Sequence, residues 1–403
     1  MKIVFKISMR EEKRRMKVGI VGLGFRLGYI VPLFVAAHPD FEVAGYVDPE
    51  PAGLPRMQDA RVSPGKQYET LEAMLDNEKL DLLMVGSPNT MHLDHIRAGL
   101  DRGLKIFTEK PVVTTEAETM ELAKLIAEHG ADRIMVGLVL RYAPLYVDLR
   151  KAQKDGLLGD IASIEASEHI PPYHGAFFMR DWRRYDRYAG GFLLKKCCHD
   201  LDLYNGVMGC RPARVASFGG RRSFTPANAP QSRGTNDLEV YHRKPSGWLG
   251  SDKVFDSDGD IIDFQTAIIE YANGASMTFH TNLNVPDDFR RFCVVGAKGM
   301  AEGDFVRNYF RVSDARTSDR LIDTTYHHAA ASDHDGAAEQ MAADVLAHLL
   351  HGAPLPVSVV DALEAGLLAI KIDEARRTRS VVNLADVWQR FDAALAGNQR
   401  LRA

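Results

Sequence analysis

A lysine that follows a short apolar run is the residue in this chain best placed to do chemistry. Residues 104–108 have the composition of a buried strand, and the chain continues as Glu109-Lys110-Pro111. A glycine-rich turn that begins at Gly22 lies earlier in the same part of the chain. Ligands of open parallel sheets bind just past the carboxyl ends of the strands. We therefore expect Lys110 to point at the ligand that the turn holds; a charged loop stiffened by proline is the alternative.

The glycine-rich turn has the arrangement of a phosphate-binding site. Gly22 and Gly24 follow a predicted strand over residues 17–21 and precede a predicted helix over residues 29–37. The backbone N–H groups of such a turn can approach a pyrophosphate at the N-terminus of the helix. The fingerprint is imperfect, because Leu27 holds the position of the usual third glycine.

Asp48 indicates which dinucleotide the turn would bind. It follows the second predicted strand, residues 42–47. A carboxylate at this place can accept hydrogen bonds from both ribose hydroxyls of an adenosine. The same carboxylate would repel a 2′-phosphate, and no arginine follows it closely. NAD is therefore favoured over NADP, and an aspartate that only caps a turn is the alternative.

The order of the predicted elements indicates two domains. Up to about residue 137, apolar strands alternate with helices, which predicts a parallel sheet covered on both faces. The later strands are longer and are joined by hairpin-type turns. The predicted fold class is α/β, with an N-terminal Rossmann parallel sheet and a C-terminal α+β domain that carries a large, mostly antiparallel open sheet. The expected divisions are an N-terminal extension (1–15), a dinucleotide-binding domain (16–140) and a substrate-binding and oligomerisation domain (141–403).

Individual elements are predicted from the same patterns. We place Pro32 near the first turn of the helix over residues 29–37, where proline is tolerated. Residues 224–260 are poor in aliphatic side chains, so we expect a long surface loop there. Further strands are predicted at residues 80–85, 134–137, 161–169, 214–223, 264–271, 276–283 and 291–295, and further helices at residues 91–102, 117–129, 338–351 and 360–377.

Composition excludes several classes of function. The chain has 403 residues and a formal net charge of −4, which gives no electrostatic footprint for nucleic acid or an anionic membrane. It contains no run of about eighteen apolar residues, so we expect no membrane span. The basic first fifteen residues lack the apolar core of a secretory signal. Four cysteines without framework spacing suit a reducing cytosol, and we expect a cytoplasmic protein.

Further motifs, taken with the glycine turn, carry a resemblance to a known family. They are Pro88-Asn89-x-x-His92, Glu109-Lys110-Pro111, Arg141-Tyr142-x-Pro144, and Gly190-Gly191 followed by His199-x-x-Asp202. From Met16 to about Leu384, the chain resembles the Gfo/Idh/MocA family of NAD(P)-dependent oxidoreductases. The resemblance implies a Rossmann domain, an α/β domain whose open sheet often makes dimer contacts, and a sugar, sugar derivative or cyclic polyol as substrate. It also implies a homodimer or homotetramer, and a cis bond between Lys110 and Pro111.

The resemblance further implies that Lys110 contacts both the reacting substrate and the nicotinamide. Oxidation of a secondary alcohol requires removal of the hydroxyl proton, and an imidazole can titrate near neutral pH, so we assign His199 as acid/base. The ammonium of Lys110 would donate a hydrogen bond to the same oxygen and stabilise the developing alkoxide.

The chain departs from the family at Lys195. Many members have an aspartate four residues before the histidine, and in a helix the two positions share a face. Either Lys195 joins Lys110 in binding substrate oxygens, which is the interpretation we prefer, or the chemistry is modified. Asp200 and Asp202 are candidates to replace the missing carboxylate.

A stretch that mixes aromatic and cationic side chains precedes Gly190. Aromatic faces suit the C–H surfaces of sugars, and arginines suit carboxylate, phosphate or sulfate groups; an exposed amphipathic loop is the alternative. The expected substrate site comprises Lys110, Tyr173, His174, Trp182, Arg183, Lys195, His199 and, from a later loop, His334. The expected cofactor site comprises Gly22, Gly24, Phe25, Arg26, Asp48, Ser87, Pro88, Asn89, His92, Glu109, Lys110 and Arg141.

The run Cys197-Cys198-His199-Asp200 contains residue types that can bind zinc. Adjacent cysteines point apart, and no second ligand pair lies at zinc spacing. Buried small hydrophobes explain the cysteines better, and we expect no metal.

Three functions follow from these expectations. We prefer an NAD(P)-dependent dehydrogenase that oxidises a secondary ring hydroxyl of a sugar, sugar derivative or inositol-like polyol. A second possibility is redox-neutral glycoside cleavage, in which a transient keto-sugar loses its substituent and is reduced again by the same NADH. A third is a non-catalytic NAD-binding regulatory protein, against which the intact Lys110 and His199 weigh.

Overall fold

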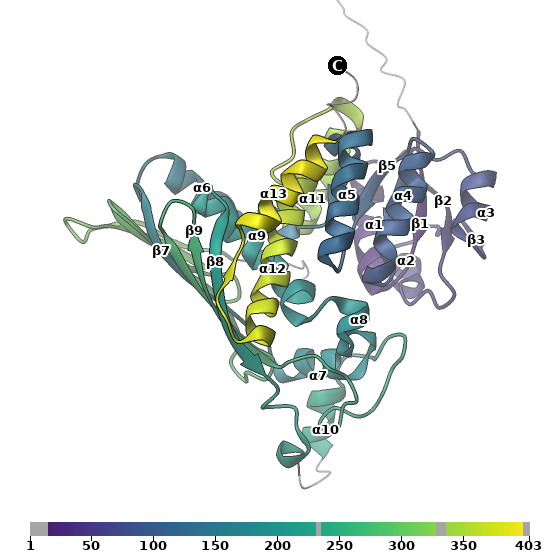
Figure 1. Cartoon of the computed structure of the whole chain (residues 1–403). Helices are drawn as coiled ribbons and strands as arrows, with labels where there is room; N and C mark the ends of the chain where they lie inside the picture. The colour runs from purple at the N-terminus through teal and green to yellow at the C-terminus, as the bar shows by residue number, and fades with distance from the viewer. Residues whose placement is uncertain (1–14, 231–234, 328–335, 398–403) are drawn as a thin grey trace, which may run out of the picture.

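Two sheets divide the molecule into two domains (Figure 1). The structure is a computed structural model that describes residues 15–230, 235–327 and 336–397. The expected N-terminal extension, apart from Arg15, lies outside the described residues, as does His334. Within the described ranges, no helix is long and apolar enough to cross a membrane.

The first domain is built on six parallel strands in the order β3-β2-β1-β4-β5-β6. The strand order reverses between β1 and β4, and ligands of such sheets bind in the crevice beside that point. Strand β4 is buried at every residue, as a parallel sheet covered on both faces requires. The strands are β1 (Met16–Val21), β2 (Phe41–Val47), β3 (Lys66–Tyr68), β4 (Leu82–Val85), β5 (Lys105–Thr108) and β6 (Ile134–Val136).

Helix α1 (Phe25–Ala37) begins directly after the glycine turn. The expected position of Pro32 near the first turn is therefore wrong, and this proline lies in the helix interior. The helix begins early because Gly24 is already its N-cap, with an extended backbone. The other helices of this domain are α2 (Leu54–Asp59), α3 (Leu71–Asn77), α4 (His92–Asp101) and α5 (Glu116–His129), with short 3-10 segments η1 (Asn89–Met91), η2 (Ala131–Arg133) and η3 (Val139–Tyr142).

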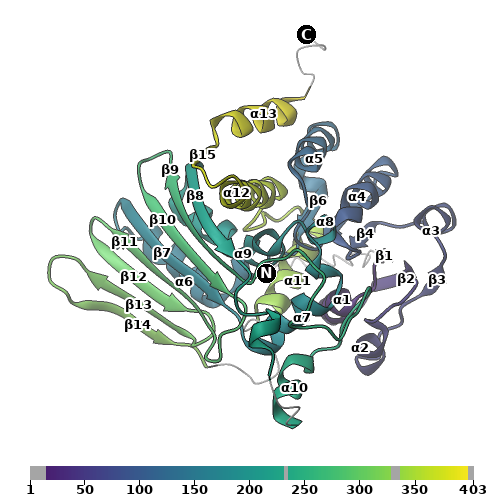
Figure 2. The same cartoon turned by 60° about the horizontal axis from the view of Figure 1, so that its bottom comes forward.

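The second domain carries a nine-stranded sheet in the order β14-β13-β12-β11-β7-β10-β9-β8-β15. Its neighbouring strands are antiparallel except for β7 and β10, which run parallel. Burial alternates along β10, so one face packs against helices and the other faces outward (Figure 2). The strands are β7 (Ile161–His169), β8 (Pro212–Gly220), β9 (Phe264–Tyr271), β10 (Ser276–Asn282), β11 (Phe289–Gly296), β12 (Gly299–Asp304), β13 (Tyr309–Asp314), β14 (Arg320–Thr325) and β15 (Val382–Asn383).

The segment expected to be a long surface loop, residues 224–260, contains helix α10 (Thr235–His242) and a small aromatic core. Phe224 is fully buried, with its ring centroid 6.2 Å from that of Tyr241 and 5.6 Å from that of Phe255. The expectation was wrong because these rings are far apart in sequence and meet only in the folded chain. The remaining helices are α6 (Pro144–Lys154), α7 (Pro172–Arg180), α8 (Asp186–Ala189), α9 (Phe192–Met208), α11 (Ala337–His351), α12 (Val359–Thr378) and α13 (Ala385–Ala396), with η4 (Trp182–Arg184) and η5 (Pro226–Asn228).

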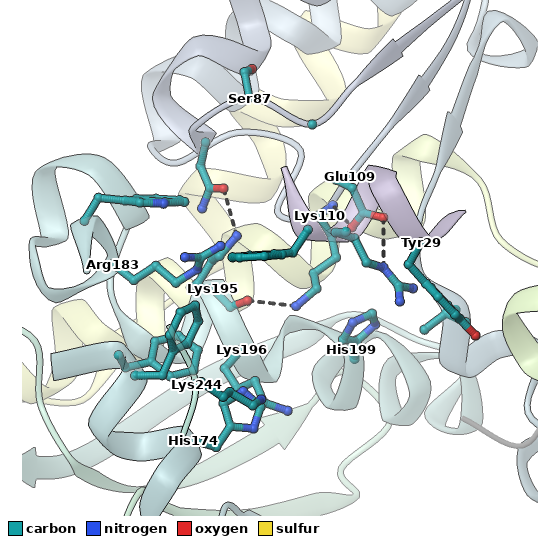
Figure 3. A pocket seen from close by; sticks show the side chains of 18 of the residues that line it. Tyr29, Ser87, Glu109, Lys110, His174, Arg183, Lys195, Lys196, His199 and Lys244 are labelled. Carbon is teal, nitrogen blue, oxygen red and sulfur yellow. Dashed lines mark hydrogen bonds and ion pairs between the residues drawn. The ribbon is translucent and has the colours of Figure 1, made fainter. Parts of the chain in front are cut away.

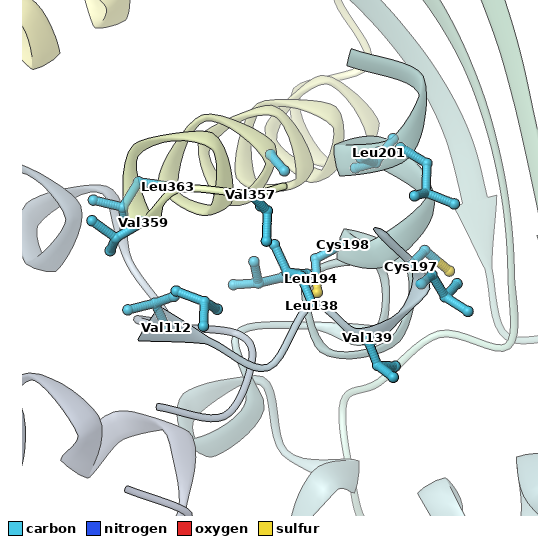
Figure 4. Close-up of a cluster of buried hydrophobic side chains, with 14 of the residues drawn as sticks. Val112, Leu138, Val139, Leu194, Cys197, Cys198, Leu201, Val357, Val359 and Leu363 are labelled. Carbon is cyan, nitrogen blue, oxygen red and sulfur yellow. The ribbon is translucent and has the colours of Figure 1, made fainter. Parts of the chain in front are cut away.

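The core that joins the two domains lies around helix α9 (Figure 4). Val112 and Leu138 of the first domain lie with Leu194 and Cys198 of α9 and Leu363 of α12, and all five side chains are buried. A helix buried on most of its surface needs small or apolar side chains at nearly every position, which explains the cysteines. This core fixes α9 against the loop that follows β5.

Candidate active site

A cavity of about 440 Å³ lies between the two domains at the carboxyl edge of the parallel sheet (Figure 3). Its volume is in the range of small-molecule and cofactor sites. The first domain lines it with Phe25, Arg26, Tyr29, Arg56, Gly86, Ser87, Asn89, His92, Glu109, Lys110 and Val139. The second domain lines it with His174, Phe177, Phe178, Trp182, Arg183, Lys195, Lys196, His199, Lys244, Pro245 and Arg290.

The glycine turn fits a bound pyrophosphate. Gly22 has a φ of +82°, and a Cβ there would lie 2.2 Å from the backbone nitrogen of Ser87, so only glycine lets the ends of β1 and β4 meet here. A Cβ on Gly24, the N-cap of α1, would meet no described atom within 4 Å. Open space before the first N–H groups of a helix is what a pyrophosphate requires.

Asp48 lies at the end of β2, next to the glycine turn. The N–H of Gly22 donates to the backbone oxygen of Val47 at 2.8 Å. The Asp48 carboxylate accepts a hydrogen bond from the N–H of Glu50 at 2.8 Å, which is the contact that the turn-capping alternative predicts. Burial raises the pKa of Asp48, and the N–H groups of Glu50 and Leu23 oppose that shift. Asp48 does not line the described cavity, so ribose recognition stays a prediction.

Lys110 follows β5 through a cis Lys110–Pro111 bond, which confirms the expected isomer. Its Nζ donates a hydrogen bond to the backbone oxygen of Lys195 at 2.9 Å, so the side chain reaches from the first domain to α9. Burial lowers the pKa of Lys110, and the charge on Lys196 lowers it further. Lys110 is thus a half-buried amine that donates to a neutral acceptor.

His92 joins the loop after β4 to the loop after β5. Its two ring nitrogens lie 3.0 Å from the backbone oxygen of Pro111 and 2.9 Å from that of Ser87. Burial, followed by the charge on Lys195, lowers the pKa of His92 to about 4. His92 lines the cavity, and its contacts position Pro111. Cofactor binding by His92 stays a prediction.

Lys195 faces the first domain from α9. Its Nζ donates a hydrogen bond to Oδ1 of Asn89 at 3.0 Å and lies 5.2 Å from the ring centroid of Trp182. Burial, followed by the charges on Arg183 and Lys110, holds the pKa of Lys195 well below its ordinary value. Lys195 therefore shares the cavity with Lys110.

His199 lies one helical turn further along α9 and is 6% exposed in the same cavity. The two aspartates considered as its partners form ion pairs elsewhere. Asp200 pairs with Arg290 at 2.6 Å, and Asp202 pairs with Arg141 at 2.6 Å. Both carboxylates thus already bind a guanidinium. A role for either of them as the partner of His199 stays a prediction.

Three further residues expected at the site lie outside the cavity lining. Arg141 binds Asp202 and so anchors α9. Pro88 is flanked by two lining residues but does not line the cavity itself. The ring of Tyr173 lies 4.8 Å from the guanidinium of Arg243. A contact between the cofactor and Arg141 or Pro88, or between the substrate and Tyr173, stays a prediction.

The aromatic and cationic stretch before Gly190 does reach the cavity. Trp182 is 7% exposed, and the guanidinium of Arg183 lies 4.4 Å from its ring centroid and pairs with Asp181. His174 also lines the cavity; burial, followed by the charge on Lys196, holds its pKa well below the ordinary value. The alternative of an exposed loop is wrong, because these side chains pack inward.

Several lining residues were missed by sequence reasoning. Lys196 had a usable signal, because it lies three residues before His199 and so close to the same helix face. Lys244 and Arg290 had none, since a loop and a distant strand bring them to the site. The missed residues are Tyr29, Arg56, Gly86, Val139, Phe177, Phe178, Lys196, Lys244, Pro245 and Arg290.

A buried ion-pair network adjoins the second-domain side of the cavity. Glu168, Cys197 and Asp200 offer ligand atoms within 4.8 Å of one another, as a metal site would. Lys196 pairs with Glu168, and Arg290 pairs with Glu168 at 3.3 Å as well as with Asp200. Burial alone would raise the pKa of Glu168, but Arg290 and Lys196 hold it below its usual range. Cationic side chains thus neutralise the carboxylates that a metal would need.

A parallel sheet with a glycine turn, joined to a second domain that completes a cavity containing lysine and histidine, defines a dinucleotide-dependent oxidoreductase. Residues 16–138 match the family model described as "Oxidoreductase family, NAD-binding Rossmann fold". Residues 150–384 match the model described as "Oxidoreductase family, C-terminal alpha/beta domain". The chain belongs to the Gfo/Idh/MocA family of oxidoreductases.

Individual proteins of known sequence or structure are similar to most of this chain or to part of it. The Bacillus subtilis protein YteT is 23% identical over 314 residues, which cover 68% of this chain and 73% of YteT. Inositol 2-dehydrogenase of Rhizobium meliloti is 24% identical over 202 residues, covering 50% of this chain and 58% of that protein. The structure of levoglucosan dehydrogenase, solved with NADH and levoglucosan, covers 92% of this chain and 100% of its own chain. The TM-score is 0.72 and the sequence identity is 19%, so this likeness shows the fold alone.

Proposed function

We propose that this protein is an NAD-dependent dehydrogenase that oxidises a secondary ring hydroxyl of a sugar or cyclic polyol. The observation that carries the proposal is the meeting of Lys110 and His199 in one cavity, one from each domain, at the edge that holds the glycine turn. The names of its relatives support the substrate class, since they include inositol 2-dehydrogenase and levoglucosan dehydrogenase.

Each residue has a separate task in this proposal. A bound nicotinamide supplies the hydride acceptor. Lys110 donates a hydrogen bond to the reacting hydroxyl oxygen and stabilises the negative charge that develops on it. His199 accepts the hydroxyl proton at a ring nitrogen. His199 is buried and Lys110 is half-buried, which strengthens both interactions because water screens charges less there.

We propose NAD in preference to NADP. Asp48 follows β2, and a carboxylate after the second strand of a Rossmann domain can bind the adenosine ribose and disfavours a 2′-phosphate. The ratio of kcat/KM values for the two cofactors tests this choice. A preference for NADP would contradict it.

A second candidate is the redox-neutral cleavage of a glycoside, and Lys195 is the observation that favours it. The residue replaces the aspartate of many family members, and one relative at 23% identity over 202 residues is 2,7-anhydro-N-acetylneuraminate hydratase of Escherichia coli. Release of an aglycone without net NADH would support this candidate, whereas accumulation of NADH with a ketone product would exclude it.

We also propose that the protein is a cytoplasmic homodimer or homotetramer. The outward face of the nine-stranded sheet exposes Phe218 and Ile268, which are 72% and 55% exposed, and the four cysteines are free. Light scattering tests the assembly, and a monomer of 44.8 kDa in solution would contradict it.

The direct test of the dehydrogenase is a panel of sugars, uronates, glycosides and inositols incubated with the protein and NAD. Absorbance of NADH should rise with at least one ring polyol. Absence of NADH and of any ketone product across the panel, with NAD binding verified, would contradict the proposal.

A further inference from the structure

The second-domain wall of the cavity is cationic. This domain contributes five Lys, Arg, Asp or Glu side chains to the described lining, and all five carry a positive charge. They are Arg183, Lys195, Lys196, Lys244 and Arg290. A neutral sugar does not need such a wall, because its hydroxyl groups are bound as well by amides and carboxylates.

Buried carboxylates neutralise three of these cations. Arg183 pairs with Asp181, while Lys196 and Arg290 share Glu168 and Asp200. The positive charge of these three groups is therefore balanced within the protein itself.

Lys110 and Lys195 differ from those three. Their Nζ atoms donate the described hydrogen bonds to neutral oxygens, the backbone oxygen of Lys195 and Oδ1 of Asn89, at 2.9 and 3.0 Å. Both lysines are half-buried, and Glu109, a carboxylate whose charge acts on both, is itself paired with Arg26 at 3.3 Å. An ammonium that is partly shielded from water and donates to neutral oxygens is unfavourable, and an opposite charge relieves that free-energy cost. The depressed pKa of Lys195 follows from the same burial and from the like charges of Arg183 and Lys110.

Trp182 marks where an opposite charge would bind. Its ring centroid lies 5.2 Å from Nζ of Lys195 and 4.4 Å from the guanidinium carbon of Arg183, so two cationic groups approach one indole. Lys110 is assigned to the reacting oxygen, which leaves the charge of Lys195 to be matched. Lys244, the fifth cation, lies instead at the rings of Tyr173 and Phe177. The single ammonium of Lys195 at the indole matches a monoanion better than a dianion.

We propose that the substrate is an acidic sugar of the uronate class, whose carboxylate binds Lys195 and Arg183 beside Trp182 while its ring hydroxyl meets Lys110 and His199. This inference rests on the proposed function and names the substrate class of the same site. The carboxylate takes the place at which many family members carry the aspartate side chain.

The test compares matched pairs of substrates, galacturonate with galactose and glucuronate with glucose. Wild-type kcat/KM should favour the acid of at least one pair by about tenfold or more, which corresponds to about 1.4 kcal/mol. Lys195→Gln should reduce this ratio by about tenfold, and Lys195→Arg should retain most of it. Lys151→Gln is the matched control, because Lys151 pairs with Asp155 on the exposed face of α6 and should leave the ratio unchanged.

Three results would overturn the inference. They are equal kcat/KM values within both pairs, an unchanged ratio in Lys195→Gln, and a preference for galactose 6-phosphate over galacturonate. If no sugar is oxidised, the proposed dehydrogenase function fails. The inferred binding of a uronate can then still be tested by measuring ligand binding. In that case galacturonate, with NAD present, should raise the melting temperature of the wild type and not of Lys195→Gln. No such difference would overturn it.

Discussion

The two walls of the cavity are built in different ways. The first-domain wall consists of residues of α1 and α2 and of the segments that follow β4, β5 and β6, among them Glu109 and Lys110. The second-domain wall consists of side chains that come from α7, η4, α9, the segment after α10 and β11. The first wall suits the dinucleotide, which is the same for every substrate. The second wall suits the substrate itself, whose structure can vary.

The comparison has a direct experimental consequence. Changes in the first wall should reduce cofactor binding or turnover with every substrate. Changes in the second wall should alter proton transfer or the choice of substrate while NAD remains bound.

The largest effect is expected from Lys110→Ala. Loss of the hydrogen bond to the developing alkoxide should lower kcat by about 10³-fold, as removal of an oxyanion-hole donor does. Steady-state assays measure kcat, and titration of NAD should give a dissociation constant close to that of the wild type. Lys105→Ala is the control, because Lys105, at the start of the strand that precedes Lys110, pairs with Asp132 near the surface and should leave kcat unchanged. Full activity of Lys110→Ala would show that its assignment is wrong.

His199→Asn should have the next largest effect, on the other wall. Removal of the general base should lower kcat/KM by about 10²-fold or more. The profile of kcat/KM against pH should also lose its acidic limb, since no imidazole would then need to be neutral for turnover. Retention of both the rate and the limb would remove His199 from the mechanism. His129→Asn, on helix α5, serves as the control.

His92 predicts a pH effect on the stability of the first wall. Its pKa is about 4 in the folded protein and about 6.5 in the unfolded chain. Between these values the unfolded chain binds a proton that the folded protein does not, so stability falls as the pH falls from 6.5 to 4. Urea unfolding of the wild type should lose about 2 kcal/mol more between pH 7.5 and pH 5 than unfolding of His92→Asn. Identical pH dependence of the two proteins would contradict this account.

Gly24→Ala should have the smallest effect, confined to the cofactor. Its Cβ would meet no described atom within 4 Å, so the melting temperature should stay close to that of the wild type. The methyl group would enter the space assigned to the pyrophosphate and should weaken NAD binding by about tenfold. Gly22→Ala makes a sharp contrast, because its Cβ would clash with Ser87 and should destabilise the fold itself. Unchanged NAD affinity in Gly24→Ala would place the pyrophosphate elsewhere.

The same contrast explains what could be predicted from the sequence. The glycine turn and the strands of the parallel sheet have patterns that are local in the chain, and these patterns were sufficient. The cis Lys110–Pro111 bond was expected from the family resemblance and not from a local pattern. The aromatic core around Phe224 and the pairing of Asp200 with Arg290 depend on contacts across many residues, for which no local pattern exists. Pro32 was misplaced because helix α1 begins at Phe25, four residues before the predicted start at residue 29, so the proline lies in the helix interior.

The central claim is that the Lys110 and His199 cavity removes hydrogen from a ring carbinol carbon and passes it to NAD. The most direct measurement incubates the protein with NAD and ring-deuterated galacturonate or inositol, and determines the mass of the nicotinamide product. The account predicts reduced cofactor that carries one deuterium, formed together with a ketone. Reduced cofactor without deuterium, or none at all while NAD is bound, would contradict it.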